Sequence, residues 1–125
     1  MVAEHGHAAR LRVARTYLGL DKDEMAAKLR VNRANQARWE SGQYPIPAGI
    51  WDEIDHLYSE FDADVEALLE NTEPDEAGRR WVRVWRGRTA DNPFPGWRLR
   101  VASEAMRRDP TIEPVFPEDD PRPKE

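Results

Sequence analysis

Three side chains in a short stretch of the chain carry the hydrogen-bonding groups that can read the edges of DNA bases. Arg33 and Arg38 can each donate two parallel hydrogen bonds to O6 and N7 of guanine, and Asn35 can pair with N6 and N7 of adenine. Ala34 can contact a thymine methyl group. The spacing predicts that one short helix presents these residues to base pairs. The alternative is that both arginines are ordinary exposed helix residues.

The rest of the sequence offers little catalytic chemistry. The chain contains no cysteine, which excludes disulfides, thiolate nucleophiles and cysteine-based metal sites. His5, His7 and His56 lack the His-x-x-x-His spacing of a metal site, and no glycine-rich phosphate loop is present. We therefore expect that the protein is not an enzyme and that it needs no metal and no cofactor.

The elements that must position the candidate residues are helices. Apolar residues at helical spacing predict a first helix from Ala8 to Leu18, ended by Gly19. Asp21 followed by Glu24 is a capping signal that announces a second, shorter helix. The sequence thus predicts two helices within about the first 30 residues, separated by a turn at Gly19.

Two further helices complete the N-terminal part. Asn32 is a suitable N-cap for a third helix over Arg33–Ser41, with Gly42 just after its end. A tight turn between the second and third helices predicts a helix-turn-helix. Pro47 is placed to be the first residue of a fourth helix, whose apolar periodicity continues to about Asn71.

The C-terminal part has a different pattern. Residues 79–86 are rich in valine and tryptophan and predict a strand, with Val82 and Val84 on one face and Trp81, Arg83 and Trp85 on the other. A helix over 97–108 and a second strand over 112–116 follow. Pro114 places that second strand at a sheet edge.

These patterns predict a mainly α protein with a small C-terminal α+β unit. We expect a helix-turn-helix domain with a long fourth helix over residues 1–72, a strand–helix–strand unit over 79–117 and a disordered tail over 118–125. The 125-residue chain has a net charge of −5, but residues 51–78 hold 11 acidic and no basic groups. We interpret this block as a solvated face, which leaves the basic segments on either side free to bind a polyanion.

Residues 18–42, LGLDKDEMAAKLRVNRANQARWESG, resemble the Cro/C1-type (lambda-repressor-like) helix-turn-helix family. The resemblance implies an ion pair between Arg15 and Glu40. It also implies contacts to the DNA backbone from Lys22 and from Ser41, Gln43 and Tyr44. The predicted DNA-binding residues are therefore Lys22, Asn32, Arg33, Ala34, Asn35, Gln36, Arg38, Ser41, Gln43 and Tyr44.

Two residues depart from the family pattern. Arg30 stands where most members have glycine, and a left-handed residue other than glycine costs about 1–2 kcal/mol. Gln36 stands where the family buries valine or isoleucine. A buried amide without partners is costly, so the other interpretation is that Gln36 leans outward and adds a base contact.

The order of elements, with Asp91-Asn92-Pro93 and Gly96-Trp97-Arg98-Leu99 before the C-terminal helix, is similar to that of the anti-CRISPR-associated (Aca) autoregulators and the YdiL-like regulators. That resemblance implies a strand–helix–strand dimerisation domain. The candidate interface residues are Trp81, Trp85, Phe94 and Trp97, and the alternative is that they form a local core.

We therefore expect a sequence-specific transcriptional repressor that binds an inverted-repeat operator in double-stranded DNA as a homodimer and regulates its own small operon. One alternative is an antitoxin with a toxin partner. Another is an RNA or single-strand binder that stacks bases on the Arg/Trp strand. No apolar run reaches the roughly 18–20 residues of a membrane span, and residues 1–10 lack a secretory apolar region, so we expect a cytoplasmic protein without membrane contact.

Overall fold

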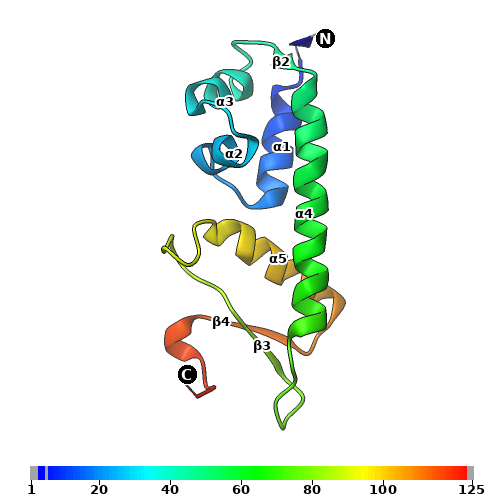
Figure 1. Ribbon diagram of the computed structural model, residues 1–125, viewed down its shortest axis with the longest axis vertical. Helices are drawn as coiled ribbons and strands as arrows, with labels where there is room; N and C mark the ends of the chain where they lie inside the picture. The colour runs from blue at the N-terminus through cyan, green and yellow to red at the C-terminus, as the bar shows by residue number, and fades with distance from the viewer. Residues whose placement is uncertain (1–2, 5, 124–125) are drawn as a thin grey trace. The chain divides into compact units, whose positions relative to one another are not determined.

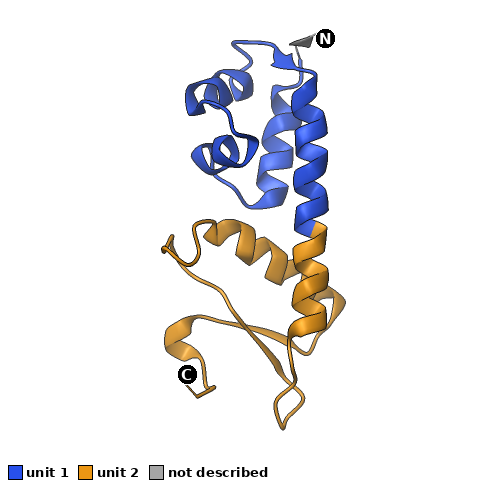
Figure 2. Ribbon diagram, viewed as in Figure 1, with its two compact units in different colours: residues 1–61 blue, residues 62–125 orange. Residues whose placement is uncertain are grey.

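The structure is a computed structural model that describes residues 3–4 and 6–123 (Figure 1). The described part is mainly helical, with five α-helices and two small two-stranded sheets. This agrees with the predicted mainly α protein with a small C-terminal α+β unit. The chain divides into two compact units, residues 1–61 and 62–125 (Figure 2). The expected boundary after residue 72 differs from this division, because the last turns of the fourth helix pack within the second unit.

The first unit is built from three short helices and the start of a long one. They are α1 (Ala8–Leu18), α2 (Lys22–Leu29), α3 (Arg33–Glu40) and α4 (Gly49–Asn71). Apolar residues recur along α1 at the predicted spacing, and Leu11 and Leu18 are fully buried. Met25 of α2 is also fully buried. The short helices are held by this shared core, because helices of their length are marginal alone.

Local capping determines where the short helices begin. The Asp21 carboxylate accepts a hydrogen bond from the Glu24 amide at 2.7 Å, and the Glu24 carboxylate accepts one from the Asp21 amide at 2.9 Å. This reciprocal pair is the capping box that the sequence predicts. Asn32 caps α3 through a single hydrogen bond, which its side-chain oxygen accepts from the Ala34 amide at 2.7 Å.

A small antiparallel sheet, which the sequence pattern does not predict, joins β1 (Ala3–Glu4) to β2 (Ile46–Pro47). Pro47 lies in β2, whereas we expected it to be the first residue of the long helix. That helix begins at Gly49 instead. Ile46 is buried in the core of the first unit, which holds the preceding segment in an extended conformation.

Arg30 caps the end of α2 in the left-handed conformation, with φ 59° and ψ 43°. Among the described residues it is the only non-glycine residue with positive φ. We expect Arg30→Gly to raise the free energy of unfolding by up to about 1 kcal/mol, because relief of the strain exceeds the added entropy of the unfolded chain. Urea denaturation measures this change.

The matched control places the same substitution inside a helix. Arg12→Gly in the middle of α1 is expected to lower the free energy of unfolding by about 1 kcal/mol, since glycine weakens a helix interior. If both variants lose stability by similar amounts, Arg30 is not strained.

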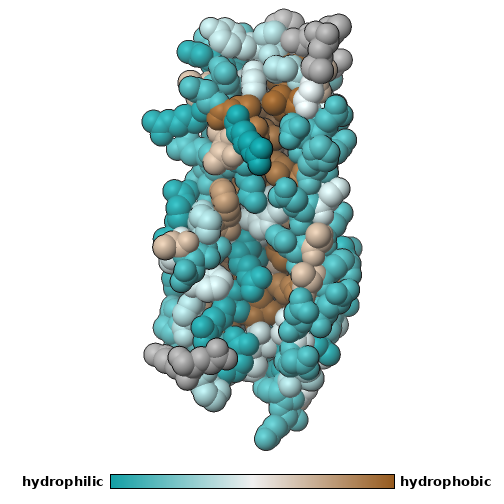
Figure 3. Space-filling view, viewed as in Figure 1, coloured by the Kyte–Doolittle hydropathy of each residue, from teal (hydrophilic) through white to brown (hydrophobic). Residues whose placement is uncertain are grey.

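The second unit is a strand–helix–strand arrangement together with the end of α4. Strands β3 (Arg80–Arg83) and β4 (Ile112–Val115) are parallel and are connected through α5 (Pro95–Arg108). A 3₁₀ helix, η1 (Pro117–Asp119), follows β4. Val82 and Val84 are buried whereas Trp81 and Trp85 are half-buried, which is the predicted alternation. Hydrophilic side chains cover most of the face drawn in Figure 3.

Both free edges of this sheet are partly blocked. Arg80 and Val84 donate backbone hydrogen bonds to β4, so the backbone groups of Trp81 and Arg83 point to the other edge. There the Trp81 carbonyl accepts a hydrogen bond from Arg122 at 3.2 Å, and the Arg83 carbonyl accepts one from Arg98 at 3.0 Å. Thr111 and Val115 carbonyls face β3, so Pro114, which has no N–H, lies on the outer edge of β4. These features discourage addition of another strand.

Trp97 is a core residue of the second unit rather than a surface residue. Its side chain is buried, and its Nε1 donates a hydrogen bond to the Asp64 carboxylate of α4 at 2.8 Å. A second link between the same two helices joins Arg108 to Glu66 at 2.7 Å. The expected role of Trp97 in a dimer interface is therefore wrong, and the alternative of local core packing holds for this residue.

The acidic block behaves as the charge pattern predicts. Every one of its carboxylate residues, from Asp52 to Glu76, is exposed. The expected disordered tail differs from the structure, because the chain is described to Pro123 and the Asp120 side chain is only 2% exposed. Its carboxylate accepts hydrogen bonds from Arg83 at 2.6 Å and from Arg122 at 2.9 Å. Lys124 and Glu125 lie outside the described residues.

The two arginines hold the pKa of Asp120 well below its usual range, with Arg122 contributing more than Arg83. A lowered pKa in the folded state means that the ionised carboxylate stabilises the fold above about pH 4 and that this contribution is lost as the pH falls. We expect Asp120→Asn to lower the free energy of unfolding at pH 7 and the deficit to shrink at pH 3. Urea denaturation at both pH values measures it.

Asp119→Asn is the matched control, because Asp119 is exposed in the adjacent 3₁₀ helix. It should leave stability nearly unchanged at both pH values. An Asp120→Asn deficit of the same size at pH 3 and pH 7 would contradict the role of the ionised carboxylate.

Candidate nucleic-acid interface

Helix α3 has one exposed face and one buried face. Gln36 and Trp39 are buried, whereas Arg33, Ala34 and Arg38 are exposed. The exposed positions follow helical spacing and therefore lie on one side of the helix. The structure thus brings the two predicted arginines and the predicted methyl contact onto one surface. Asn35 lies at its margin and is half-buried.

A polar cluster fixes the inner face of α3. The Arg15 Nε donates to both Glu40 carboxylate oxygens, at 3.0 and 2.9 Å, and Arg15 Nη1 donates to the Leu20 carbonyl at 3.0 Å. The Glu40 side chain is 3% exposed and that of Arg15 is 14% exposed. The structure therefore contains the ion pair that the family resemblance implies, and the pair joins α1 to the end of α3.

Gln36 belongs to the same cluster. Its side chain is fully buried, and its Nε2 donates a hydrogen bond to the Glu40 carboxylate at 2.7 Å. In the described part of the chain its Oε1 has no hydrogen-bond partner. Gln36 cannot reach a base from this position, so its expected place among the DNA-contacting residues is wrong. The Glu40 carboxylate holds the amide inward, where the family pattern has an aliphatic side chain.

The loop after α3 folds back onto the end of the helix. The Arg38 carbonyl accepts hydrogen bonds from the Ser41 hydroxyl and from the Gln43 amide, both at 3.0 Å. The Arg38 guanidinium lies 5.2 Å from the centre of the Tyr44 ring, which is 47% exposed. These bonds place Ser41, Gln43 and Tyr44 beside Arg38, so the predicted backbone-contact residues adjoin the predicted base-contact residues.

The remaining predicted contacts lie at the beginnings of α2 and α3. Lys22 is exposed as the first residue of α2. Arg33 is 77% exposed and its Nη1 lies 3.6 Å from the Asp23 carboxylate, which is 64% exposed. Because water screens such an exposed pair, Asp23 holds Arg33 only weakly. Arg33 can therefore exchange this partner for another hydrogen-bond acceptor.

The exposed face of α3 contains one residue that sequence reasoning missed. Ala37 is exposed four positions after Arg33 and three after Ala34, and so lies between the two arginines. Its small side chain leaves room for the helix to approach another surface closely. The helical spacing from Arg33 is the signal that could have identified it.

The Arg/Trp strand of the second unit is much less available. Trp81 Nε1 donates a hydrogen bond to the Asp75 carboxylate at 2.9 Å, which also lowers the pKa of Asp75. Arg83 is bonded to Asp120, and Arg86 donates to the Glu118 carboxylate at 2.7 Å. Because these carboxylates already occupy the arginines, this face is a poor platform for stacking single-stranded bases.

No group of three or more histidine, cysteine or acidic side chains in the described part of the chain is arranged to hold a metal ion, and His5 lies outside the described residues. No helix of that part is both long and apolar enough to cross a membrane.

Comparison of the chain with protein-family models, with curated proteins and with solved structures found no match.

Proposed function

We propose that the chain is a sequence-specific transcriptional repressor that binds double-stranded DNA through a helix-turn-helix formed by α2 and α3. The observation that carries the proposal is the division of α3 into a buried, polar-bonded face and an outer face with Arg33 and Arg38. A helix of this length fits the major groove, and its outer side chains then reach base edges.

Charge supports the same surface. The acidic residue of α3, Glu40, is already bonded to Arg15 and Gln36. The outer face of α3 therefore presents the positive charges of Arg33 and Arg38 near the exposed Lys22 at the start of α2, with the exposed Asp23 carboxylate beside Arg33. Neutralisation of DNA phosphates by such groups releases counterions, so affinity should fall steeply as salt rises.

We further propose that the protein binds an inverted repeat as a homodimer and, following its resemblance to the autoregulators named above, represses its own operon. Because both edges of the β3–β4 sheet are partly blocked, we expect pairing through side-chain faces. Leu99 and Met106 of α5 are 42% and 44% exposed and lie two helical turns apart on one face. The half-buried Trp81, Trp85 and Phe94 remain candidates in the same unit.

Selection of bound DNA from a random pool at two salt concentrations, with the mass measured in solution, tests the proposal. We expect a symmetric motif with half-sites about 34 Å apart or a multiple of that, weaker recovery at high salt and a mass of twice 14.5 kDa. Recovery of unrelated sequences would contradict sequence-specific binding, and an asymmetric motif bound by a monomer would contradict the dimer.

The double variant Leu99→Glu/Met106→Glu tests the pairing surface. We expect it to sediment as a monomer and to bind the selected operator at least tenfold more weakly, because buried unpaired carboxylates would oppose pairing. Val13→Glu is the control, since Val13 is a 68% exposed apolar residue of α1 in the first unit. If the double variant remains a dimer, the dimer interface does not include Leu99 and Met106.

A further inference from the structure

The candidate DNA-binding surface contains one negative charge that attraction to DNA does not explain. Helices α2 and α3 contain three acidic residues, Asp23, Glu24 and Glu40. Glu24 is bonded within the capping box of α2, and Glu40 is bonded within the polar cluster of α3. Of these three described residues, only Asp23 has an exposed carboxylate, and it lies beside Lys22 at the start of α2. A carboxylate at this place repels the phosphates that Lys22 attracts.

Asp23 contacts the first residue of the helix that is proposed to read bases. Its carboxylate lies 3.6 Å from Nη1 of Arg33, and within the described residues Asp23 is the only ion-pair partner of Arg33. The separation exceeds that of a hydrogen bond, and the two side chains are 64% and 77% exposed. The pair therefore contributes little to the stability of the free protein.

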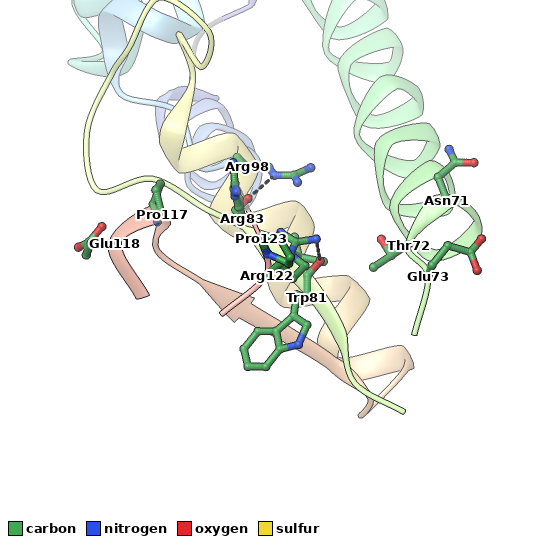
Figure 4. A pocket seen from close by; sticks show the side chains of 11 residues that line it. Asn71, Thr72, Glu73, Trp81, Arg83, Arg98, Pro117, Glu118, Arg122 and Pro123 are labelled. Carbon is green, nitrogen blue, oxygen red and sulfur yellow. Dashed lines mark hydrogen bonds between the residues drawn. The ribbon is translucent and has the colours of Figure 1, made fainter. Parts of the chain in front are cut away.

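Carboxylates that stabilise the fold bind arginine differently in this protein. In the second unit, Arg83 and Arg122 line a groove of about 1280 Å³ (Figure 4). They share the Asp120 carboxylate, which is 2% exposed, at 2.6 and 2.9 Å. Such short charged bonds, with a carboxylate shielded from water, hold the C-terminal segment in place. Asp23 makes no bond of this kind, so the stability of the fold does not account for its position beside Arg33.

The contact with Asp23 leaves Arg33 with the atoms that guanine reading requires. The planar guanidinium and Nε of an arginine carry five N–H donors. A carboxylate at Nη1 leaves the edge formed by Nε and Nη2 for O6 and N7 of guanine. Water is excluded when α3 enters the major groove, so the attraction between Asp23 and Arg33 becomes stronger there. The carboxylate thus holds the guanidinium in an orientation suited to guanine.

Binding to an unrelated sequence carries a different cost. Where no guanine is in reach, Arg33 can turn to a phosphate, but Asp23 then faces the DNA backbone without its cation. Like charges that face each other across an interface oppose binding. The same carboxylate therefore supports the specific binding mode and opposes the non-specific one.

We propose that Asp23 is a positioning and specificity-determining residue, which orients Arg33 toward guanine and opposes contact between Arg33 and phosphate. This inference rests on the proposed function. It goes further because it assigns part of the discrimination between operator and other DNA to a repulsive group rather than to an additional base contact.

The position of Asp23 in the first turn of α2 requires a matched control, because a negative charge there stabilises any helix. Asp52 is exposed in the first turn of α4 and provides this control. Asp23→Asn and Asp52→Asn each remove one such charge with little change of shape. Both variants should lose similarly little stability in urea denaturation, so a difference in DNA binding between them reports on the place of Asp23.

Fluorescence anisotropy of the full chain with the selected operator and with a random duplex tests the inference. We expect Asp23→Asn to bind random DNA about fivefold more tightly, because a like charge no longer faces the phosphates. Operator affinity should change by less than about twofold, since the lost repulsion and the lost orientation of Arg33 offset each other. The operator-to-random affinity ratio should therefore fall about fivefold, whereas Asp52→Asn should change this ratio by less than about twofold.

A second comparison shows whether Asp23 acts through Arg33. In an Arg33→Ala background, Asp23→Asn should raise affinity for both duplexes equally and leave their ratio unchanged, since only the repulsion is then removed. A ratio that still falls means that Asp23 contacts bases directly. Equal changes for both duplexes in the parent background mean that Asp23 acts only as a charge. Either result overturns the inference, as does a ratio equal to that of Asp52→Asn.

Failure of this inference can be told apart from failure of the proposed function. A parent chain that binds all duplexes equally rejects sequence-specific binding and the role of Asp23 with it. A parent chain that prefers its operator, with the same preference in Asp23→Asn, rejects only the role of Asp23.

Discussion

Replacing Arg33 by alanine is expected to weaken binding to the selected operator by about 1–3 kcal/mol per half-site, that is, by about 5- to 160-fold. Binding to random DNA should change far less, because Arg33 is expected to bond to guanine rather than to phosphate. The side chain is 77% exposed and is held only by the weak contact with Asp23, so alanine should not disturb the fold. Fluorescence anisotropy with operator and random duplexes measures both affinities.

The base-reading role of Arg33 is tested by comparing Arg33→Ala with a variant that loses a different exposed arginine. Arg12→Ala removes an exposed arginine from α1, outside the candidate surface. It should reduce affinity for operator and random DNA by the same small factor. If Arg33→Ala also weakens both duplexes equally, Arg33 acts only through its charge and the base-reading role must be abandoned.

Removing the Glu40 carboxylate should have the largest effect on stability. We expect Glu40→Met to lower the free energy of unfolding by about 3 kcal/mol, because Arg15 and the Gln36 amide then lose their partner inside the protein. The loss should lie near the lower end of values for buried pairs, since Arg15 retains 14% exposure. Urea denaturation measures the change, with the exposed Asp55→Ala of α4 as control.

The physical cause can be separated from a simple packing defect. The triple variant Arg15→Met/Gln36→Leu/Glu40→Met removes the orphaned groups together and should recover most of the lost stability, since apolar side chains often replace buried ion pairs without cost. A triple variant as unstable as Glu40→Met alone would mean that the cost arises from shape and not from charge. Operator binding by the recovered variant then shows whether the cluster serves only to hold α3.

Much of the fold could be predicted from the sequence because its causes are local. The capping pair of Asp21 and Glu24, the Asn32 cap and the left-handed Gly19 each act within one helical turn, and the structure places helix ends at these residues. The alternation of buried and half-buried side chains around Val82 likewise could be predicted, because successive side chains of a strand point to opposite faces. The choice of Arg33 and Arg38 as partners on one face also followed from helical spacing.

Other features depended on residues far away in the sequence. The local sequence pattern is compatible with an inward or an outward Gln36 side chain. In the structure the Glu40 carboxylate holds the Gln36 amide inward, and Glu40 is itself held by the Arg15 guanidinium of α1. Trp97 could become a core residue because the Asp64 carboxylate of α4 satisfies its buried indole N–H.

The C-terminal segment shows the same limit. Its composition predicts disorder, yet Asp120 is buried between arginines that include Arg83 of β3. Spacing along the chain by itself determined which residues share a helix face or a strand face, because those relations are set by backbone geometry. Only the tertiary structure decided which polar groups became buried, since burial and pairing require partners that the fold brings from other segments.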